Sequence, residues 1–209
     1  MSERDRGPGA PPITHHSSLI TRLPVVVGIS GASGAALARA AILALGRAGH
    51  PVVATCSPAG ARVWREEMDE GFERFAEGAG KQFSLEVIDI GDIGASIGSG
   101  RRRTAGMLVA PCSMDTHSAI AHGRSTNLLE RAADVTLKEG RRLVLIPRES
   151  PLSPIHLENM LKLSQIGVRI VLPVPAFYRK PASLDEVIED VAARAIGALG
   201  IHLEEEEER

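Results

Sequence analysis

Six short apolar runs alternate along the chain with longer stretches in which apolar residues repeat at helical spacing. The runs are rich in Val, Ile and Leu without polar alternation, which is typical of parallel strands covered on both faces. Strands are predicted at 24–30, 51–56, 85–90, 106–110, 142–147 and 168–172. Helices are predicted at 34–48, 57–69, 115–121, 125–139, 154–166 and 183–199.

This alternation predicts an α/β fold with a doubly wound, mainly parallel sheet sandwiched by helices, Rossmann-like or flavodoxin-like in type. Ligands of such folds gather at the carboxyl ends of the strands. The 209 residues suit a single domain, which we place at 23–201. Residues 1–22 are polar and broken by Pro and Gly, so a flexible tail is expected there, and residues 202–209 form an acidic tail.

The composition narrows the classes of partner. A net charge of −2 and an aromatic content of 3% argue against nucleic-acid binding. No apolar segment is long enough to span a bilayer and no secretory signal opens the chain, so no membrane association is expected. Cys56 and Cys112 each end a predicted strand and do not suggest a disulfide framework, which favours a cytoplasmic location.

The stretch "GISGASGA" joins the first predicted strand to the first helix. Gly28, Gly31 and Gly34 are spaced by three, which is not the G-x-G-x-x-G pattern of dinucleotide binding. The second strand ends in "ATCSPAG" without a carboxylate for a ribose, and no P-loop lysine follows the glycines, so NAD and ATP are both disfavoured. The amides at this helix start suit another anion, with Ser30 and Ser33 adding hydroxyls. The alternative is that the glycines only allow close packing.

Other predicted strand ends also carry polar groups. In "PCSMDTHSAIAHG", Ser113, Asp115 and Thr116 open a helix, either as an anion site or as an ordinary N-cap. The adjacent Arg148 and Glu149 follow the fifth strand, where a charged pair indicates a site.

Two further segments are less decisive. "PVPAFYRKP" is either a rigid cover loop or a lid that brings the only tyrosine, Tyr178, to the site. Arg131 and Lys138 lie seven residues apart on one side of a predicted helix, too far apart to hold one small anion within a subunit unless the helix end points at it. The spacing alone favours two solvated bases.

Taken together, these segments resemble the flavin prenyltransferases of the UbiX type. The resemblance is carried by "GISGASGA", "PCSMDTHSAIAHG", "NLLERAADVTLKEGRRLVLIPRESPLSPIHLENMLKLSQIG" and "PVPAFYRKPASLDEVIEDVAARAIGALG", and it covers about residues 24–201. It implies transfer of a dimethylallyl group from dimethylallyl phosphate to N5 and C6 of reduced FMN. The product, prenylated FMN, would serve a partner decarboxylase of the UbiD type. It also implies a metal-independent reaction and a homo-oligomer, usually a dodecamer.

The resemblance also implies roles for individual residues. Contacts to FMN are expected from Gly31, Ala32, Ser33, Ser57, Ser113, Met114, Asp115, Thr116 and Arg148. The prenyl phosphate would be held by Lys138, Tyr178 and Arg194, with Arg131 and Glu67 nearby, at a site assembled between subunits. Glu149, with Ser33 as relay, would remove the C6 proton, and Phe177 with the Pro-rich lid would exclude water.

The chain departs from the family pattern at a few positions. Arg101, Arg102 and Arg103 replace the usual Ser-Phe-polar triplet, Pro58 replaces a common Lys, and Ala36-Leu37 replaces a frequent aromatic. Two alternatives remain open: a non-catalytic flavin-binding or delivery protein, and a flavin-dependent Cys decarboxylase of similar fold. The decarboxylase would need a His soon after the first strand and an Asn-Met motif in a loop, whereas "ENM" falls in a predicted helix.

Overall fold

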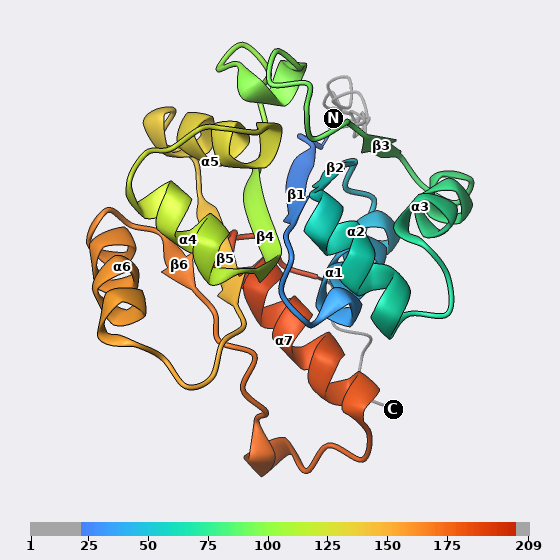
Figure 1. Cartoon of the computed structure of the whole chain (residues 1–209). Coiled ribbons are helices and arrows are strands. Elements are labelled where there is room, and N and C mark those ends of the chain that lie inside the picture. Colours follow the sequence, from blue (N-terminus) through green and yellow to red (C-terminus); the bar gives the residue numbers. More distant parts are fainter. Residues whose placement is uncertain (1–21, 204–209) are drawn as a thin grey trace, which may run out of the picture.

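The computed structural model describes residues 22–203 and contains a six-stranded sheet (Figure 1). The strands are β1 Val25–Ile29, β2 Val52–Cys56, β3 Leu85–Val87, β4 Gly106–Cys112, β5 Leu143–Pro147 and β6 Arg169–Ile170. Their order is β3-β2-β1-β4-β5-β6 and every neighbouring pair is parallel. This order confirms the doubly wound fold and reverses direction between β1 and β4, where such folds bind ligands.

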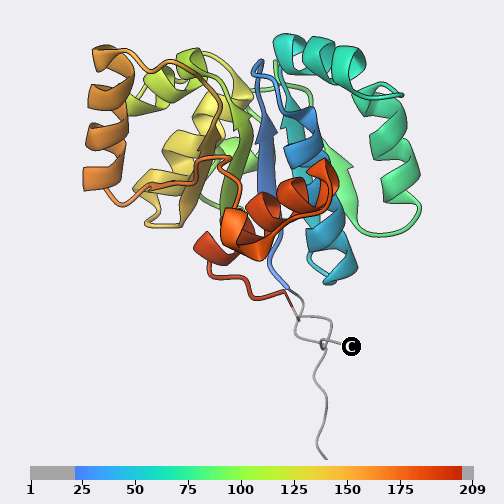
Figure 2. The same cartoon turned by 90° about the horizontal axis from the view of Figure 1, so that it is seen from below.

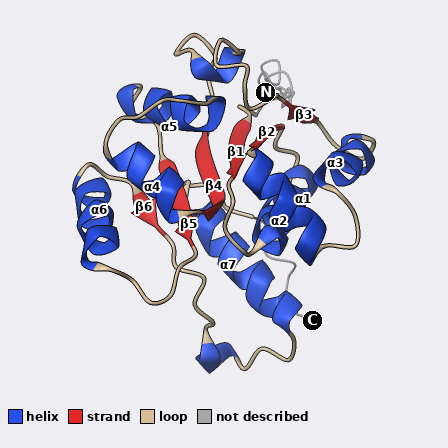
Figure 3. Ribbon diagram, in the orientation of Figure 1, coloured by secondary structure: helices blue, strands red, loops and turns tan. Residues whose placement is uncertain are grey.

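Helices cover both faces of the sheet (Figure 3). They are α1 Ala35–Arg47, α2 Pro58–Glu67, α3 Phe72–Gly80, α4 Met114–Ala121, α5 Leu128–Lys138, α6 Pro154–Gln165 and α7 Leu184–Ala198, with short 3-10 turns η1 Ser96–Gly98 and η2 Phe177–Arg179. One buried cluster joins α1, α2, α3 and α7 to one face, and a second joins α4, α5 and α6 to the other. Successive residues of β1 alternate between the two clusters, which explains why its sequence is apolar throughout.

The strands share one direction, so one edge of the sheet holds all their carboxyl ends. In Figure 2 the chain runs up β1 and returns down α1, and the carboxyl ends of the strands therefore lie at the top. We call this end of the sheet the carboxyl edge, and the opposite end the amino edge.

Helix α3 is the one α-helix of residues 22–203 that the sequence analysis did not predict. Its apolar residues Phe72, Phe75, Ala76 and Ala79 do have helical spacing, but glycines flank and interrupt the segment. The helix is stabilised by packing of Phe72 and Phe75 on Trp64, each with ring centroids 5.1 Å from the indole. Tertiary packing, which a local pattern does not contain, decides this element.

The outer strands are shorter than predicted. Strand β3 ends at Val87, which is exposed, and β6 has only two residues within the predicted run 168–172. Both are edge strands, with a hydrogen-bonding neighbour on one side only. The expected tail residues 1–21 and 204–209 lie outside the described part of the chain. No helix of residues 22–203 is long and apolar enough to cross a membrane.

Candidate functional site

The loops that follow β1 and β4 are tied together at the point where the strand order reverses. The buried Ser30 hydroxyl donates to the carbonyl of Pro111 (2.9 Å) and accepts a hydrogen bond from the Ser113 amide (2.7 Å). The Ser30 amide donates to the same carbonyl at 3.2 Å. Both loops are therefore held in one arrangement before any ligand arrives. The sequence shows Ser30 only as an extra hydroxyl, and its bridging role depends on the fold.

Two positions of "GISGASGA" require a glycine, each for a different structural reason. A Cβ on Gly31 would stand 2.5 Å from the Cβ of Ala59, so α2 packs directly on the loop. Gly34 has φ +116°, a conformation that other residues rarely adopt, where the chain turns into α1. Close packing therefore accounts for part of this motif.

The anion at the start of α1 is supplied by the chain itself. The Glu67 carboxylate, from the end of α2, accepts hydrogen bonds from the amides of Gly34 (2.9 Å) and Ala35 (2.8 Å). Burial would raise the pKa of the Glu67 carboxyl, but bonds from Ser33, Gly34 and Ala35 and the positive charge of Arg148 outweigh it and lower the pKa. The expectation that these amides await a ligand anion is corrected, because Glu67 already occupies them.

Helices α2 and α4 begin with serine caps at the same edge. The Ser57 hydroxyl accepts from the amide of Gly60 (3.0 Å), and the Ser113 hydroxyl accepts from the amide of Thr116 (3.3 Å) and donates to its hydroxyl (3.1 Å). The N-cap interpretation is thus correct for Ser113, and Ser57 has the same role, which was not predicted. Pro58 follows Ser57 as the first residue of α2, a favourable N-terminal position.

The first amides of α4 lie at the carboxyl edge without an acceptor among the described residues, as do the amides of Gly31, Ala32 and Ser33 after β1. Within residues 22–203 the amides of Met114 and Asp115 have no hydrogen-bond partner, whereas those of Ser113 and Thr116 are bonded. The Asp115 carboxylate turns away and pairs with Arg124 at 3.1 Å. If Asp115 contacts a ligand, its backbone does so rather than its carboxylate.

The charged pair after β5 is exposed. The Arg148 amide donates to the carbonyl of Cys112 (3.3 Å), which brings this loop beside that of β4. The Glu149 carboxylate accepts from the amide of Ser150 (3.0 Å), while the Ser33 hydroxyl bonds Glu67. The proton relay from Glu149 through Ser33 stays a prediction.

A cavity of about 350 Å³ opens beside Glu67 at the start of α1. Ser33 and Glu67 supply its polar side chains, and the remaining lining is apolar or glycine: Gly34, Ala36, Leu37, Met68, Pro173, Leu184, Val187, Ile188 and Val191. Ala36 and Leu37, which the sequence analysis named as a departure from the family pattern, therefore contribute to a pocket. The cavity suits a small apolar group next to a hydroxyl and a carboxylate.

The segment of residues 173–183, which we call the lid segment, lies over α7. Phe177 and Tyr178 are 77% and 82% exposed, so neither touches the carboxyl-edge loops in this single chain. Arg194 of α7 donates to the carbonyl of Val174 (2.8 Å) and pairs with Asp190 (2.8 Å). The structure therefore brings Arg194 to the lid segment, and it leaves Tyr178 facing outward.

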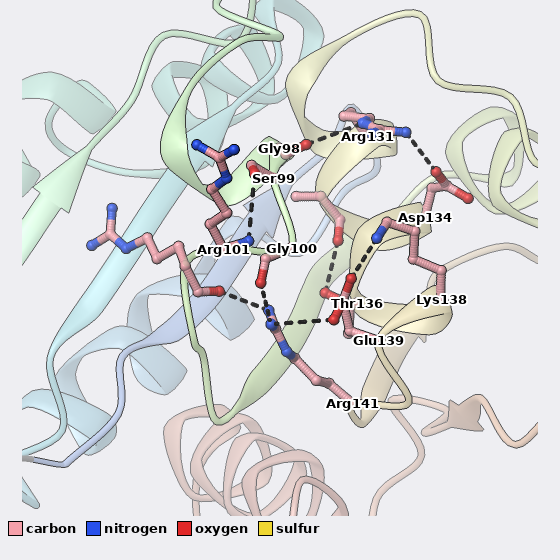
Figure 4. A network of polar contacts seen from close by, with 12 residues as sticks. Gly98, Ser99, Gly100, Arg101, Arg131, Asp134, Thr136, Lys138, Glu139 and Arg141 are labelled. Atoms are coloured by element: carbon pink, nitrogen blue, oxygen red, sulfur yellow. Dashed lines mark hydrogen bonds and ion pairs between the residues drawn. The ribbon is translucent and has the colours of Figure 1, made fainter.

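Lys138 and Arg131 lie elsewhere, in a group that we call the cationic cluster: Arg131, Lys138, Arg141 and the loop of residues 98–103 (Figure 4). Lys138 ends α5, which returns to the amino edge before β5 begins at Leu143. A strand of five to seven residues spans about 16–23 Å. Within one chain, Lys138 is therefore separated from the carboxyl edge by the length of the sheet.

The two cysteines are poorly suited to nucleophilic chemistry. Burial raises the pKa of the half-buried Cys56 to about 12 and raises that of the fully buried Cys112 as well, so both stay thiols at neutral pH. No group of three His, Cys, Asp or Glu side chains in residues 22–203 is arranged to hold a metal ion.

The chain matches known proteins over most of its length. Residues 13–195 match a family model described as Flavoprotein. A Synechocystis protein named flavin prenyltransferase UbiX is 44% identical over 188 residues, covering 85% of this chain and 91% of the relative.

Two solved structures are similar in fold and sequence. A dodecameric FMN-dependent UbiX-like decarboxylase from Escherichia coli O157:H7 has a TM-score of 0.82 and 39% identity, covering 90% of this chain and all of that one. AnUbiX in complex with FMN and dimethylallyl pyrophosphate has a TM-score of 0.83 and 37% identity, covering 90% and 97%. FMN-dependent cysteine decarboxylases such as TvaF share the fold at 14% identity. By its family model and its relatives, this chain belongs to the UbiX flavin prenyltransferases.

Proposed function

We propose that this protein transfers a dimethylallyl group from a dimethylallyl phosphate donor to N5 and C6 of reduced FMN. The observation that carries the proposal is the group of loops after β1 and β4, which we call the carboxyl-edge crevice. Ser30 ties these loops together, the amides of Met114 and Asp115 stay unpaired there within the described residues, and an apolar cavity opens beside the loop after β1. Membership of the UbiX family supports assigning this crevice to a flavin.

The residues at the crevice fit FMN. The close approach of Gly31 to Ala59 brings the start of α2 beside the loop after β1, so the two loops that end β1 and β2 lie together. The amides of Met114 and Asp115 and the exposed Arg148 are donors suited to phosphate or ring oxygens. Ala32, Ser33, Ser57, Ser113 and Thr116 line the same three helix starts and complete the predicted FMN contacts.

Bound reduced FMN supplies the nucleophilic N5 and C6 positions, and the chain's residues supply the rest. The lining of the cavity suits the five-carbon group and shields it from water. Lys138, Tyr178 and Arg194, with Arg131 nearby, stabilise negative charge on the departing phosphate. Glu67 is fixed beside Ser33 and orients its hydroxyl. Glu149 accepts the C6 proton, directly or through Ser33.

This assignment requires more than one copy of the chain. Lys138 and Arg131 belong to the cationic cluster near the amino edge, whereas the crevice is at the carboxyl edge. Exposed apolar side chains on α6 and at its C-cap provide a surface for self-association: Ile155, Leu157, Leu161 and Ile166. We therefore propose a homo-oligomer in which the cationic cluster of one copy completes the crevice of another, with a dodecamer as the expected assembly.

Prenylated FMN is a finished cofactor, so the recipient is proposed to be a decarboxylase of the UbiD type. The two unpaired cysteines are compatible with a reducing cytoplasm, which we propose as the location. A Cys decarboxylase would need a His soon after β1 and an Asn-Met motif in a loop. This alternative is disfavoured because Ser30 follows β1 and because Asn159 and Met160 lie inside α6.

The test is an anaerobic incubation with reduced FMN and either dimethylallyl phosphate or the diphosphate, followed by mass spectrometry of the released flavin. A flavin heavier by one prenyl group is expected. Unmodified FMN with both donors would leave the non-catalytic delivery protein as the better hypothesis. Glu149→Gln is expected to retain FMN binding and to stop before the fourth ring closes, which the flavin absorption spectrum detects. The matched control is Glu158→Gln on α6.

A further inference from the structure

A loop with three consecutive arginines begins against the proposed phosphate ligand Lys138 (Figure 4). A Cβ added to Gly100 would come within 3.2 Å of the Lys138 Nζ and would overlap the Glu139 carboxylate that pairs with this lysine. Residues 101–103 follow immediately. Gly100, the residue before the arginine run, therefore lies beside the lysine ammonium and its carboxylate partner.

Two arginines outside the run hold its backbone in place. The Arg131 Nε donates to the carbonyl of Gly98 (3.1 Å). Arg141 donates to the carbonyls of Gly100 (3.0 Å) and Arg102 (2.9 Å). Three loop carbonyls are thus bound to side chains of α5 and of the residue shortly after it. Because the loop is already ordered, binding a ligand there has a small entropic cost.

The three arginines of the run are not equivalent. Arg102 turns back and donates to Glu86 (2.6 Å) and Ser96 (2.5 Å). Arg101 and Arg103 are exposed, and neither has a carboxylate partner in the described part of the chain. Arg102 therefore fastens the loop, and the other two guanidinium groups are available to an anion.

The cluster and its partners carry excess positive charge. Six cationic side chains are opposed by three carboxylates, which leaves three positive charges: Arg101, Arg102, Arg103, Arg131, Lys138 and Arg141 against Glu86, Asp134 and Glu139. Lys138 and Arg131 are each already paired with a neighbouring carboxylate. The uncompensated charge is therefore on the arginine run, beyond the residues assigned to a single phosphate.

We infer that Arg101 and Arg103 form a subsite for the second phosphate of the donor, so that this enzyme prefers dimethylallyl diphosphate to the monophosphate. The forked guanidinium group matches the oxygens of a terminal phosphate and stays charged at all relevant pH values. The inference rests on the proposed function, because it takes Lys138 as the ligand of the first phosphate.

Binding of inorganic anions tests the subsite without turnover. Isothermal titration of the assembled protein with inorganic diphosphate and with inorganic phosphate is compared for the wild type and the variant R101S/R103S. We expect diphosphate to bind the wild type about tenfold more tightly than phosphate, and the variant to lose most of that advantage. Arg74→Ser, which removes an equally exposed arginine on α3, is the control and leaves the advantage unchanged.

Activity measurements separate the failure of this inference from the failure of the proposed function. The variant is expected to raise KM for dimethylallyl diphosphate about tenfold and KM for the monophosphate less than threefold, with kcat largely retained. If neither donor yields prenylated flavin, the proposed function is wrong. If product forms but the wild type shows no diphosphate preference, or the variant keeps it, the second-phosphate subsite is wrong.

Discussion

The carboxyl-edge crevice and the cationic cluster are both ordered by hydrogen bonds, but they are prepared for different events. In the crevice, Ser30 joins two loops and the amides at the start of α1 bind the Glu67 carboxylate. In the cationic cluster, Arg131 and Arg141 bind backbone carbonyls, and the positive charge that no carboxylate of the described chain compensates remains on the arginine run. In the proposed function, the first region holds the flavin and the second holds the phosphate of the donor. Neither region forms the proposed site alone.

The largest expected effect concerns the separation of the two regions. Lys138→Ala and Arg194→Ala are each expected to lower kcat/KM at least about a hundredfold, because each removes a charge from the departing phosphate. Mixing the two variants under conditions that exchange subunits should restore part of the activity, since some sites then combine an intact lysine with an intact arginine. Activity of the mixture, assayed by prenylated flavin, is the measurement.

A control mixture of two variants from the same cluster tests whether the recovery requires residues from different copies. Lys138→Ala mixed with Arg131→Ala should show no recovery, because both residues belong to the same cluster and no mixed site contains both. Recovery in that control, or its absence in the first mixture, would contradict a site shared between copies.

The next effect concerns the preset shape of the crevice. Gly31→Ala is expected to destabilise the fold by about 1–3 kcal/mol, because its Cβ would overlap Ala59 at the start of α2. The double variant Gly31→Ala with Ala59→Gly should recover a part of that loss. Urea denaturation followed by circular dichroism measures both. Equal stability of the single variant and the wild type would show that α2 is free to move away from the loop.

The smallest effect is a pH dependence that the crevice should show. The pKa of Glu67 is lowered from its ordinary value of 4.5, so the carboxylate stabilises the fold above that pH and the contribution is lost as the pH falls through the lowered value. Glu67→Gln should therefore be less stable than the wild type at pH 7, by up to about 1 kcal/mol, and the difference should shrink in acid. Thermal denaturation across this pH range measures it, with the exposed Glu66→Gln as control. A constant difference would contradict the capping role.

Local sequence patterns were sufficient for elements with strong periodicity and distinct ends. The apolar runs of β1, β2, β4 and β5 were placed within a few residues because a strand buried on both faces has few polar positions. Ser113 was recognised as a possible cap because capping is a local event. Helix α3 was missed because its stability comes from contacts with Trp64 on another helix.

The candidate site was less accessible to sequence reasoning. Motifs shared with the UbiX family supplied the proposed site residues, but not how they lie. No local sequence pattern indicates that Glu67 reaches the start of α1, thirty-two residues away, or that Arg141 binds the loop of residues 98–103. Pairings of this kind depend on which helix packs beside which, and that is a property of the folded sheet.

The sequence by itself determined the α/β class, the strand ends that carry polar groups, and the family. These follow from the spacing of apolar residues and from motifs, which are properties of short segments. Only the tertiary structure decided that the first helix start is capped internally and that Lys138 lies a sheet's length from the crevice. Hydrogen bonds and charges act through space, and distances in space are fixed only when the strands have paired and the helices have packed on them.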